Sequence, residues 1–147
     1  MTRLPIAYID ISFFAHATED TDKVLEAARA VIPPSFTGEV SFKRNKLKGE
    51  YGNPITYFKT KIKGDENLEA LMRHISSNLT TLDKELLLRE FHLHIDKGNL
   101  YLRLDKQSAL KGDLRLCRAD PIHIRIRFKT RKIQEMMDLC REIGLIP

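Results

Sequence analysis

The clearest chemical pattern in this sequence is a row of basic side chains that alternates with large aliphatic ones. Residues 121–129 read Pro-Ile-His-Ile-Arg-Ile-Arg-Phe-Lys, which places His123, Arg125, Arg127 and Lys129 between apolar neighbours. Successive side chains of a β-strand point to opposite faces. The segment therefore predicts a strand that packs one face into a core and presents positive charge on the other, where it could neutralise phosphates.

Positive charge is concentrated in two stretches of the chain. Residues 41–63 hold seven Lys and Arg against one acid, and residues 103–132 hold ten against three, although the net charge is only +5. The remainder of the chain is therefore acidic. Such segregation is typical of a surface that binds a polyanion. A basic chain that is merely soluble is the alternative interpretation.

Hydrophobic spacing predicts the elements that position these residues. Strands are expected at 4–16, 39–43, 55–62, 90–96, 100–104 and 122–129, with helices after Thr18, Asp65 and Thr130. Residues 82–88 favour a short helical turn, and 106–119 is less regular. Each strand has one apolar face, which in strand 4–16 is expected to consist of Ala7, Ile9, Ile11, Phe13 and Ala15. This pattern predicts an α+β fold, a two-layer sandwich of a mostly antiparallel sheet with helices on one face.

The same assignments predict which side chains cover the other face of the sheet. They are Tyr57, Lys59, Lys61, His92, His94, Tyr101, Arg103, His123, Arg125, Arg127 and Lys129. Lys and Arg would contact phosphates, and Tyr and His rings can stack on unpaired bases. An ordinary solvated sheet face is the alternative. However, no acid stands between the cations of strand 55–62 or between those of strand 122–129.

Two further basic elements are expected beside that face. The segment 43–53 reads as a basic loop of a hairpin, and it carries Lys43, Arg44, Lys46, Lys48 and Tyr51. Arg131 and Lys132 lie at the start of the last predicted helix, where free backbone N–H groups also attract anions. A long polar hairpin connection is the alternative for the loop.

Motifs for catalysis or cofactor binding are not found in the sequence. There is no Gly-x-x-x-x-Gly-Lys phosphate loop and no Gly-x-Ser-x-Gly nucleophile turn. His92, His94 and His123 could meet on one sheet face and hold a metal, which is kept as an alternative. We otherwise expect no catalytic residue, no metal and no cofactor. Cys117 and Cys140 are expected to be packing residues in a reducing compartment.

Four short stretches carry a family resemblance. They are His-Ala-Thr-Glu-Asp at 16–20, Gly-Asn-Pro-Ile at 52–55, Leu-Arg-Leu-Asp-Lys-Gln-Ser-Ala at 102–109 and Asp-Pro-Ile-His-Ile at 120–124. In this order they resemble a family of small archaeal proteins described as predicted RNA-binding, exosome-associated subunits. The resemblance spans residues 5–143. It implies a fold similar to ribosomal protein L5, with a related branch that binds 5S ribosomal RNA. Tyr51 stands where the family pattern has His, which weakens a catalytic role for that loop.

Together these observations predict one RNA-binding domain over residues 1–147, without catalytic activity and located in the cytoplasm. Exosome or ribosomal components are its expected partners, and an unpaired strand edge could support a homodimer. A membrane is excluded as a partner, because no apolar run approaches the ~18 residues of a span. Two other functions stay open: a subunit whose basic face docks an acidic protein, and the histidine-metal enzyme.

Overall fold

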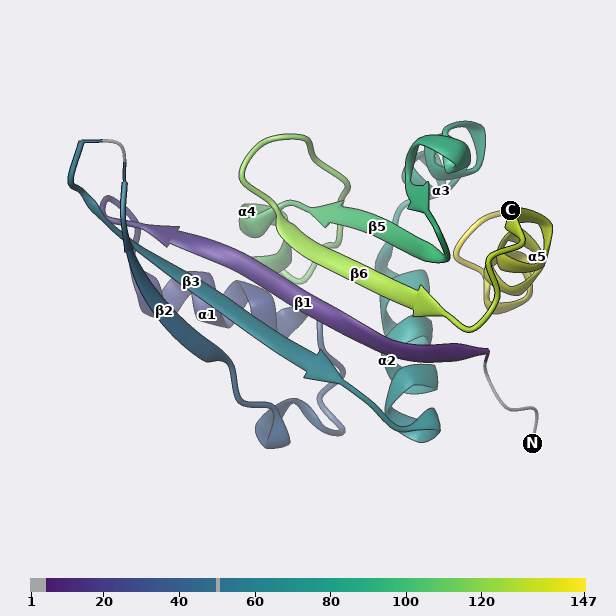
Figure 1. Ribbon diagram of the computed structural model, residues 1–147, viewed down its shortest axis with the longest axis horizontal. Coiled ribbons are helices and arrows are strands. Elements are labelled where there is room, and N and C mark those ends of the chain that lie inside the picture. Colours follow the sequence, from purple (N-terminus) through teal and green to yellow (C-terminus); the bar gives the residue numbers. More distant parts are fainter. Residues whose placement is uncertain (1–4, 50) are drawn as a thin grey trace.

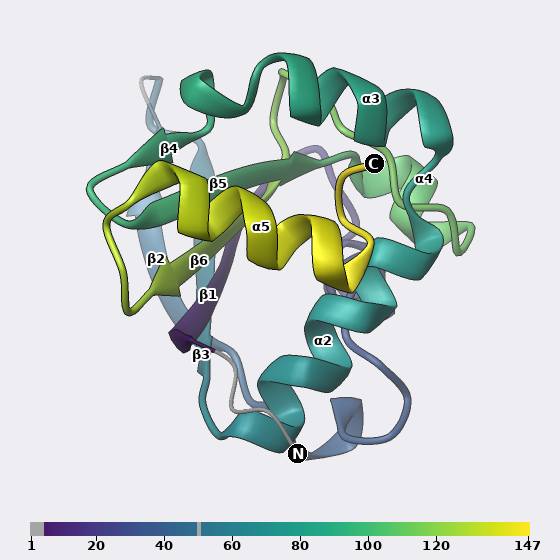
Figure 2. The ribbon, with the colours of Figure 1, turned by 90° about the vertical axis from the view of Figure 1, so that its right-hand side faces the viewer.

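A six-stranded antiparallel sheet forms one layer of the computed structural model, which describes residues 5–49 and 51–147. The long strand β1 (Ile6–His16) pairs with β3 (Pro54–Ile62) on one side and with β6 (Ile122–Phe128) on the other. Beyond β3 lies the edge strand β2 (Lys43–Lys48). Beyond β6 lie β5 (Asn99–Leu104) and the two-residue β4 (Ile95–Asp96), which is labelled in Figure 2 (Figures 1 and 2).

Helices form the second layer of the molecule. They are α1 (Thr21–Ala30), α2 (Asp65–Asn78), α3 (Thr81–Arg89), α4 (Lys106–Leu110) and α5 (Ile133–Ile143), with 3-10 turns η1 (Thr37–Glu39) and η2 (Phe91–Leu93). Figures 1 and 2 show the helices on one side of the sheet, with α3 across the edge that β4 and β5 form. No element of the described residues covers the other face. The predicted two-layer α+β sandwich is confirmed.

The core lies between the two layers. Phe13 of β1 is fully buried, stacked on Phe58 of β3 at 5.0 Å between ring centroids and in edge contact with Phe42 at 5.4 Å. The apolar face of β6 and the stripes of α2 and α5 are buried against the same layer. This one-sided burial explains why every central strand alternates between apolar and polar residues.

The predicted alternation is wrong at the start of β1. Ala7, expected to point inward, is exposed, and Ile6 is buried in its place. The pairing with β6 shifts between Ile6 and Tyr8. A β-bulge inserts one residue and so reverses which side chains face the core before it.

The expected basic loop at 43–53 is largely a strand. Residues 43–48 form β2, paired with β3, and the chain turns at 51–52. The strand expected at 39–43 is wrong, because Glu39 ends η1, residues 40–42 belong to no strand and Lys43 is the first residue of β2. Every β2 side chain is exposed, so the segment has no apolar alternation that could have predicted it. Gly52, with φ of +76°, supplies the left-handed residue that this turn needs.

The expected strand at 90–96 is also wrong except at its end. The chain there continues from α3 into η2, and only Ile95 and Asp96 pair with β5. Leu93, expected to point inward, is 70% exposed. Three apolar residues at spacing two are too few to separate a strand from the end of a helix. Residues 106–110, expected to be irregular, form α4, with the Asp105 carboxylate as its N-cap.

The buried ring of Phe13 is expected to carry a large share of stability. Phe13→Ala should lower the free energy of unfolding by about 3–5 kcal/mol, because it opens a cavity between β1 and β3. Leu82→Ala on α3 is the control, since Leu82 is 77% exposed and its loss should cost less than about 0.5 kcal/mol. Urea unfolding of both variants measures the difference, and equal midpoints would contradict this packing.

Candidate nucleic-acid interface

The uncovered sheet face gathers cations and rings from five strands. The registers place the following on it: Lys43, Asn45 and Leu47 from β2; Ile55, Tyr57, Lys59 and Lys61 from β3; Tyr8, Asp10, Ser12, Phe14 and His16 from β1; His123, Arg125 and Arg127 from β6; Asn99, Tyr101 and Arg103 from β5; and Asp96 from the short β4. We call this set the open face. It holds seven of the predicted site residues: Lys43, Lys59, Lys61, Arg103, His123, Arg125 and Arg127.

The other predicted site residues lie off the open face. Arg44 pairs with Phe58 in the register, so it points to the helix side, where its guanidinium lies 5.1 Å from the Phe58 ring centroid. By the same alternation Lys46 and Lys48 also point away from the open face. Tyr51 is 87% exposed in the turn after β2. Lys129, Arg131 and Lys132 are exposed between β6 and α5.

A carboxylate lies among the cations of the open face. Asp10 pairs with Lys61 on one side and with Arg125 on the other, and it is only 4% exposed. Arg125 Nη1 lies 3.8 Å from Asp10 Oδ2, and no hydrogen-bond partner for Asp10 Oδ1 is found among the described residues. No acid interrupts the basic row within a strand, but the neighbouring strand supplies one.

Arg125 is therefore held in place by its neighbours. Its Nε donates to Asn99 Oδ1 at 3.1 Å and its Nη2 donates to the Tyr8 hydroxyl at 3.2 Å. Lys61 Nζ lies 4.1 Å from the Tyr8 ring centroid, within cation–π range. Tyr8 and Asp10 thus fix two cations of the open face, and the sequence prediction missed this role of both residues.

Aromatic rings lie among the cations. Phe14 contacts Tyr57 at 4.9 Å between centroids, and Tyr101 is 38% exposed on β5. Burial, together with the positive charge of Arg103, lowers the pKa of His123 below its usual value of 6.5. The His123 ring is consequently neutral at pH 7, so it can stack on a base but adds little charge.

The histidines of the metal hypothesis are not brought together. His92 lies within η2 and His94 at its end, not on a strand of the open face. His94 Nδ1 is 3.1 Å from the Tyr101 carbonyl oxygen. His123 lies on β6, which is separated from the 90–96 segment by β5. The prediction that these three histidines meet on one sheet face is therefore wrong.

Neither cysteine has the character of a nucleophile. Burial and the nearby Asp105 carboxylate raise the pKa of Cys117, despite the positive charge of Arg103 nearby. Burial raises the pKa of Cys140 to about 12. Both thiols therefore stay protonated at neutral pH, as expected of packing residues.

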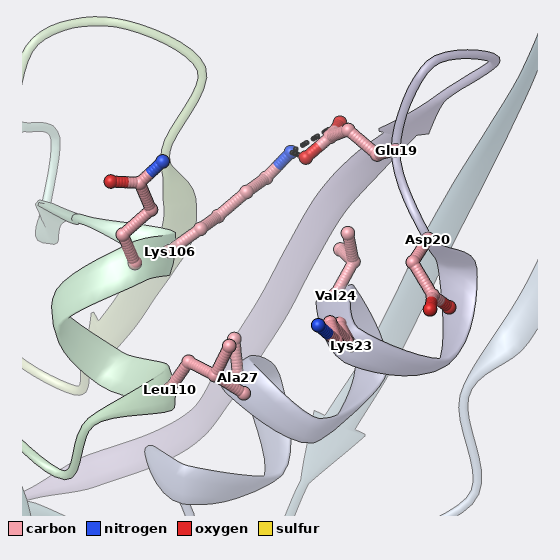
Figure 3. A pocket seen from close by; sticks show the side chains of 8 residues that line it. Glu19, Asp20, Lys23, Val24, Ala27, Lys106 and Leu110 are labelled. Carbon is pink, nitrogen blue, oxygen red and sulfur yellow. Dashed lines mark hydrogen bonds and ion pairs between the residues drawn. The ribbon is translucent and has the colours of Figure 1, made fainter.

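An ionic cluster at the end of β1 joins segments that are far apart in the sequence. Lys106 Nζ donates to the Phe14 carbonyl at 2.6 Å, to Asp120 Oδ2 at 2.9 Å and to Glu19 at 3.2 Å. His16 Nε2 lies 3.0 Å from Asp120 Oδ1. Figure 3 shows Lys106 reaching from α4 to Glu19. A hollow of about 230 Å³ lies beside them, between α1 and α4. Three of the four family-like stretches meet in this cluster.

The cluster stabilises the fold through ion pairs, and its own lysine takes the place that a metal ion would have. Ligand atoms of His16, Glu19 and Asp120 lie within 4.8 Å of one another, a spacing that could suit a cation. The Lys106 ammonium, however, already lies between the two carboxylates and supplies the positive charge. Burial disfavours the Asp120 carboxylate, but hydrogen bonds and positive charge from Lys106 and His16 outweigh it and lower its pKa.

Comparison with known proteins agrees with the chemistry of the open face. A family model described as "RNA binding" matches residues 8–128, so the chain belongs to this RNA-binding family. RNA-binding protein PAB1135 of Pyrococcus abyssi is 34% identical over 124 residues, which cover 82% of this chain and 80% of that protein. Uncharacterized protein MJ0213 of Methanocaldococcus jannaschii is 34% identical over 117 residues, 78% of each chain.

Solved structures of archaeal proteins share the fold. Protein AF2318 from Archaeglobus fulgidus matches with a TM-score of 0.79 and 28% identity, over 94% of this chain and 99% of that one. Mth689, a DUF54 protein from Methanothermobacter thermautotrophicus, matches with a TM-score of 0.77 and 31% identity, over 94% and 97%. The predicted archaeal RNA-binding family is confirmed. Across residues 5–49 and 51–147, no helix has the length and apolar character of a membrane span.

Removing the Lys106 ammonium should destabilise the fold. The side chain is only 10% exposed, and Lys106→Met leaves the Glu19 and Asp120 carboxylates facing each other without their cation. We expect a loss of roughly 2–3 kcal/mol in the free energy of unfolding. Lys111→Met, at the exposed end of α4, is the matched control and should change it by less than about 0.5 kcal/mol. Denaturant unfolding compares the two; similar losses would argue against the cluster.

Asp120 should contribute stability that depends on pH. Because its pKa is lowered in the folded protein, its contribution is present above the unfolded value of about 3.9 and is lost as pH falls through the folded pKa. Asp120→Asn should be less stable than the wild type at pH 6, with the difference shrinking below pH 4. Asn tolerates the φ of +46° at this position, so the variant tests the charge. A difference independent of pH would contradict this account.

Proposed function

We propose that this chain binds RNA through its open face and catalyses no reaction on it. The observation that carries the proposal is an uncovered sheet face on which cations and aromatic rings are interleaved, in a chain of the RNA-binding family. Lysine and arginine neutralise phosphates and release condensed counterions. Tyrosine and histidine rings add stacking on unpaired bases. A surface that only needed to be solvated would not require aromatic rings among its cations.

The register supplies a second reason to expect an anion on this face. Lys43 of β2 lies directly opposite Lys59 of β3, and both side chains are exposed. Like charges directly opposite each other on neighbouring strands destabilise a sheet. A phosphate between the two ammonium groups would relieve that repulsion.

We assign different roles in RNA binding to the cations of the open face. Arg125 is anchored to Tyr8 and Asn99 and lies near Asp10, so it orders the surface. Arg127 Nη1 donates to the Lys97 carbonyl at 2.6 Å. Lys43, Lys59 and Arg103 are the exposed cations to which we assign the main phosphate contacts. Reversing the charge of Arg125 would test folding as much as binding.

The finer expectations from the sequence and from the family resemblance are part of the same proposal. They are a link to the exosome or to ribosomal RNA, a likeness to ribosomal protein L5, a cytoplasmic location, one domain over 1–147, and a homodimer. An acidic protein partner is the second candidate, because it could pair with the same cations. Stacking separates the two, since only a nucleic acid would also engage the rings of the open face.

Salt dependence tests the proposal directly. Binding of a labelled single-stranded RNA should weaken linearly on a log–log plot against salt, with a slope of about −0.7 for each phosphate contacted. Lys59→Gln should therefore make the slope less negative by about 0.7. Lys23→Gln on α1, in the helix layer, is the matched control and should leave the slope unchanged. Fluorescence anisotropy between ~50 and ~300 mM salt measures both.

Two results would count against RNA binding by this face. The first is a wild-type protein that binds neither single-stranded nor duplex RNA at ~50 mM salt. The second is equal loss of binding in Lys59→Gln and Lys23→Gln, since RNA contact would then not depend on the open face.

A further inference from the structure

A hollow of about 290 Å³ lies at the edge of the open face beside β5. Its walls come from the end of α3 and η2 on one side and from the segment before β6 on the other, with Tyr101 and Arg103 of β5 between them. Two of its lining residues therefore also belong to the open face. A volume of this size, near the lower end for ligand sites, suits one small planar group rather than a helix.

The hydrogen bonds along β5 explain why the hollow exists. At Tyr101 the neighbour of β5 is His94, whose carbonyl accepts from the Tyr101 N–H at 2.7 Å. At Arg103 the neighbour is the 115–118 segment, because the Cys117 N–H donates to the Arg103 carbonyl at 2.9 Å. β5 thus changes partner between these two residues. The two partner segments diverge there and leave a gap that side chains line.

The two ends of the hollow have opposite charge. Arg103 and Arg118 lie at the end that the 115–118 segment forms, and both are exposed. Glu90 lies at the end that α3 and η2 form, where its carboxylate is 3.9 Å from His94 Nε2. The lining also includes Tyr101 and Leu93, and Leu93 is 70% exposed despite being large and apolar. The hollow thus combines two guanidinium groups on one wall, a carboxylate on the other, and a ring and an aliphatic side chain.

We propose that this hollow holds a single unpaired guanine nucleotide of the bound RNA, an inference that rests on the proposed function. Guanidinium groups bind phosphate, and a tyrosine ring with an aliphatic side chain can enclose a flat base. A ligand that was only an anion would be repelled by Glu90 and would not need Tyr101 or Leu93. A nucleotide matches all three parts, with phosphate at one end and base N–H groups at the other.

Glu90 supplies the preference for guanine. Guanine presents two adjacent donors, N1–H and the N2 amino group, which match the two oxygens of a carboxylate. Adenine, cytosine and uracil each place an acceptor next to their donor, and that acceptor would face a carboxylate oxygen. RNA-binding proteins recognise unpaired bases by hydrogen bonds to this Watson–Crick edge. The site therefore requires single-stranded RNA, since a duplex hides this edge in pairing.

Anisotropy with short labelled RNAs tests the inference. The wild type should bind a single-stranded RNA containing guanine more tightly than one without it, and inosine in place of guanine should weaken binding roughly tenfold by removing the N2 amino donor. Glu90→Gln should abolish the difference between guanine and inosine. Glu85→Gln removes an exposed carboxylate of α3 outside the hollow, so it is the control and should preserve the difference.

Tyr101 variants test the stacking separately. Tyr101→Ala should weaken binding of the guanine-containing RNA about five- to a hundredfold, whereas Tyr101→Phe should retain most of it. A titration with free guanosine monophosphate, monitored through the NMR shifts of β5 amides, tests whether the hollow prefers a nucleotide within an RNA strand or a free nucleotide. Guanosine monophosphate should compete with the RNA for the hollow and bind more weakly.

The outcomes separate this inference from the proposed function. If the wild type binds RNA but guanine, inosine and the Glu90 and Tyr101 variants make no difference, the guanine site is wrong and RNA binding by the open face stands. If guanosine monophosphate binds without competing with RNA, the assignment to RNA is overturned. If no RNA binds at all, the proposed function itself fails.

Discussion

One-sided burial of the sheet is the constraint on which the rest of this molecule depends. The helices of the described residues pack on one face of the sheet, with α3 across its β4–β5 edge, so β6 and the part of β1 after its bulge point apolar side chains toward them at every second position. The intervening side chains must therefore point to the opposite face of the sheet and form its surface. The open face is thus a consequence of the core, and its cations and rings come from five strands that only pairing brings together. Binding residues held on strands are fixed by the same hydrogen bonds that hold the fold.

Electrostatic interactions between neighbouring strands then determine which cations of the open face are available to a partner. Tyr8 and Asp10 of β1 hold one cation from each neighbouring strand, Arg125 of β6 and Lys61 of β3. Asp10 is almost buried, and it offsets positive charge at the centre of the face. The exposed cations at the flanks, such as Lys59 and Arg103, keep their charge available to a partner. Function is therefore expected at the flanks and at the β5 edge rather than at the centre.

The ionic cluster around Lys106 connects the fold to the family resemblance. Its members lie in three separate stretches, 16–20, 102–109 and 120–124, and they meet at the end of β1. The short motifs that identify the family are thus largely structural at these positions. Motifs that signal a family do not have to mark its binding surface, and here the cations and rings of the open face lie mostly between them.

The sequence by itself determined the class of the fold and most of its basic surface. Period-two alternation in β1, β3, β5 and β6 assigned Lys59, Lys61, Arg103 and Arg125 to one face, because alternation follows directly from strand geometry and one-sided burial. It could not determine β2, whose side chains are all exposed and carry no pattern, nor η2, where three apolar residues suit either a strand or a helix end. Only the tertiary structure decided that Asp10 lies between Lys61 and Arg125, that Lys106 joins Glu19 to Asp120, and that β5 changes partners beside Tyr101. Each of these depends on contacts between residues distant in sequence, and no local spacing encodes such contacts.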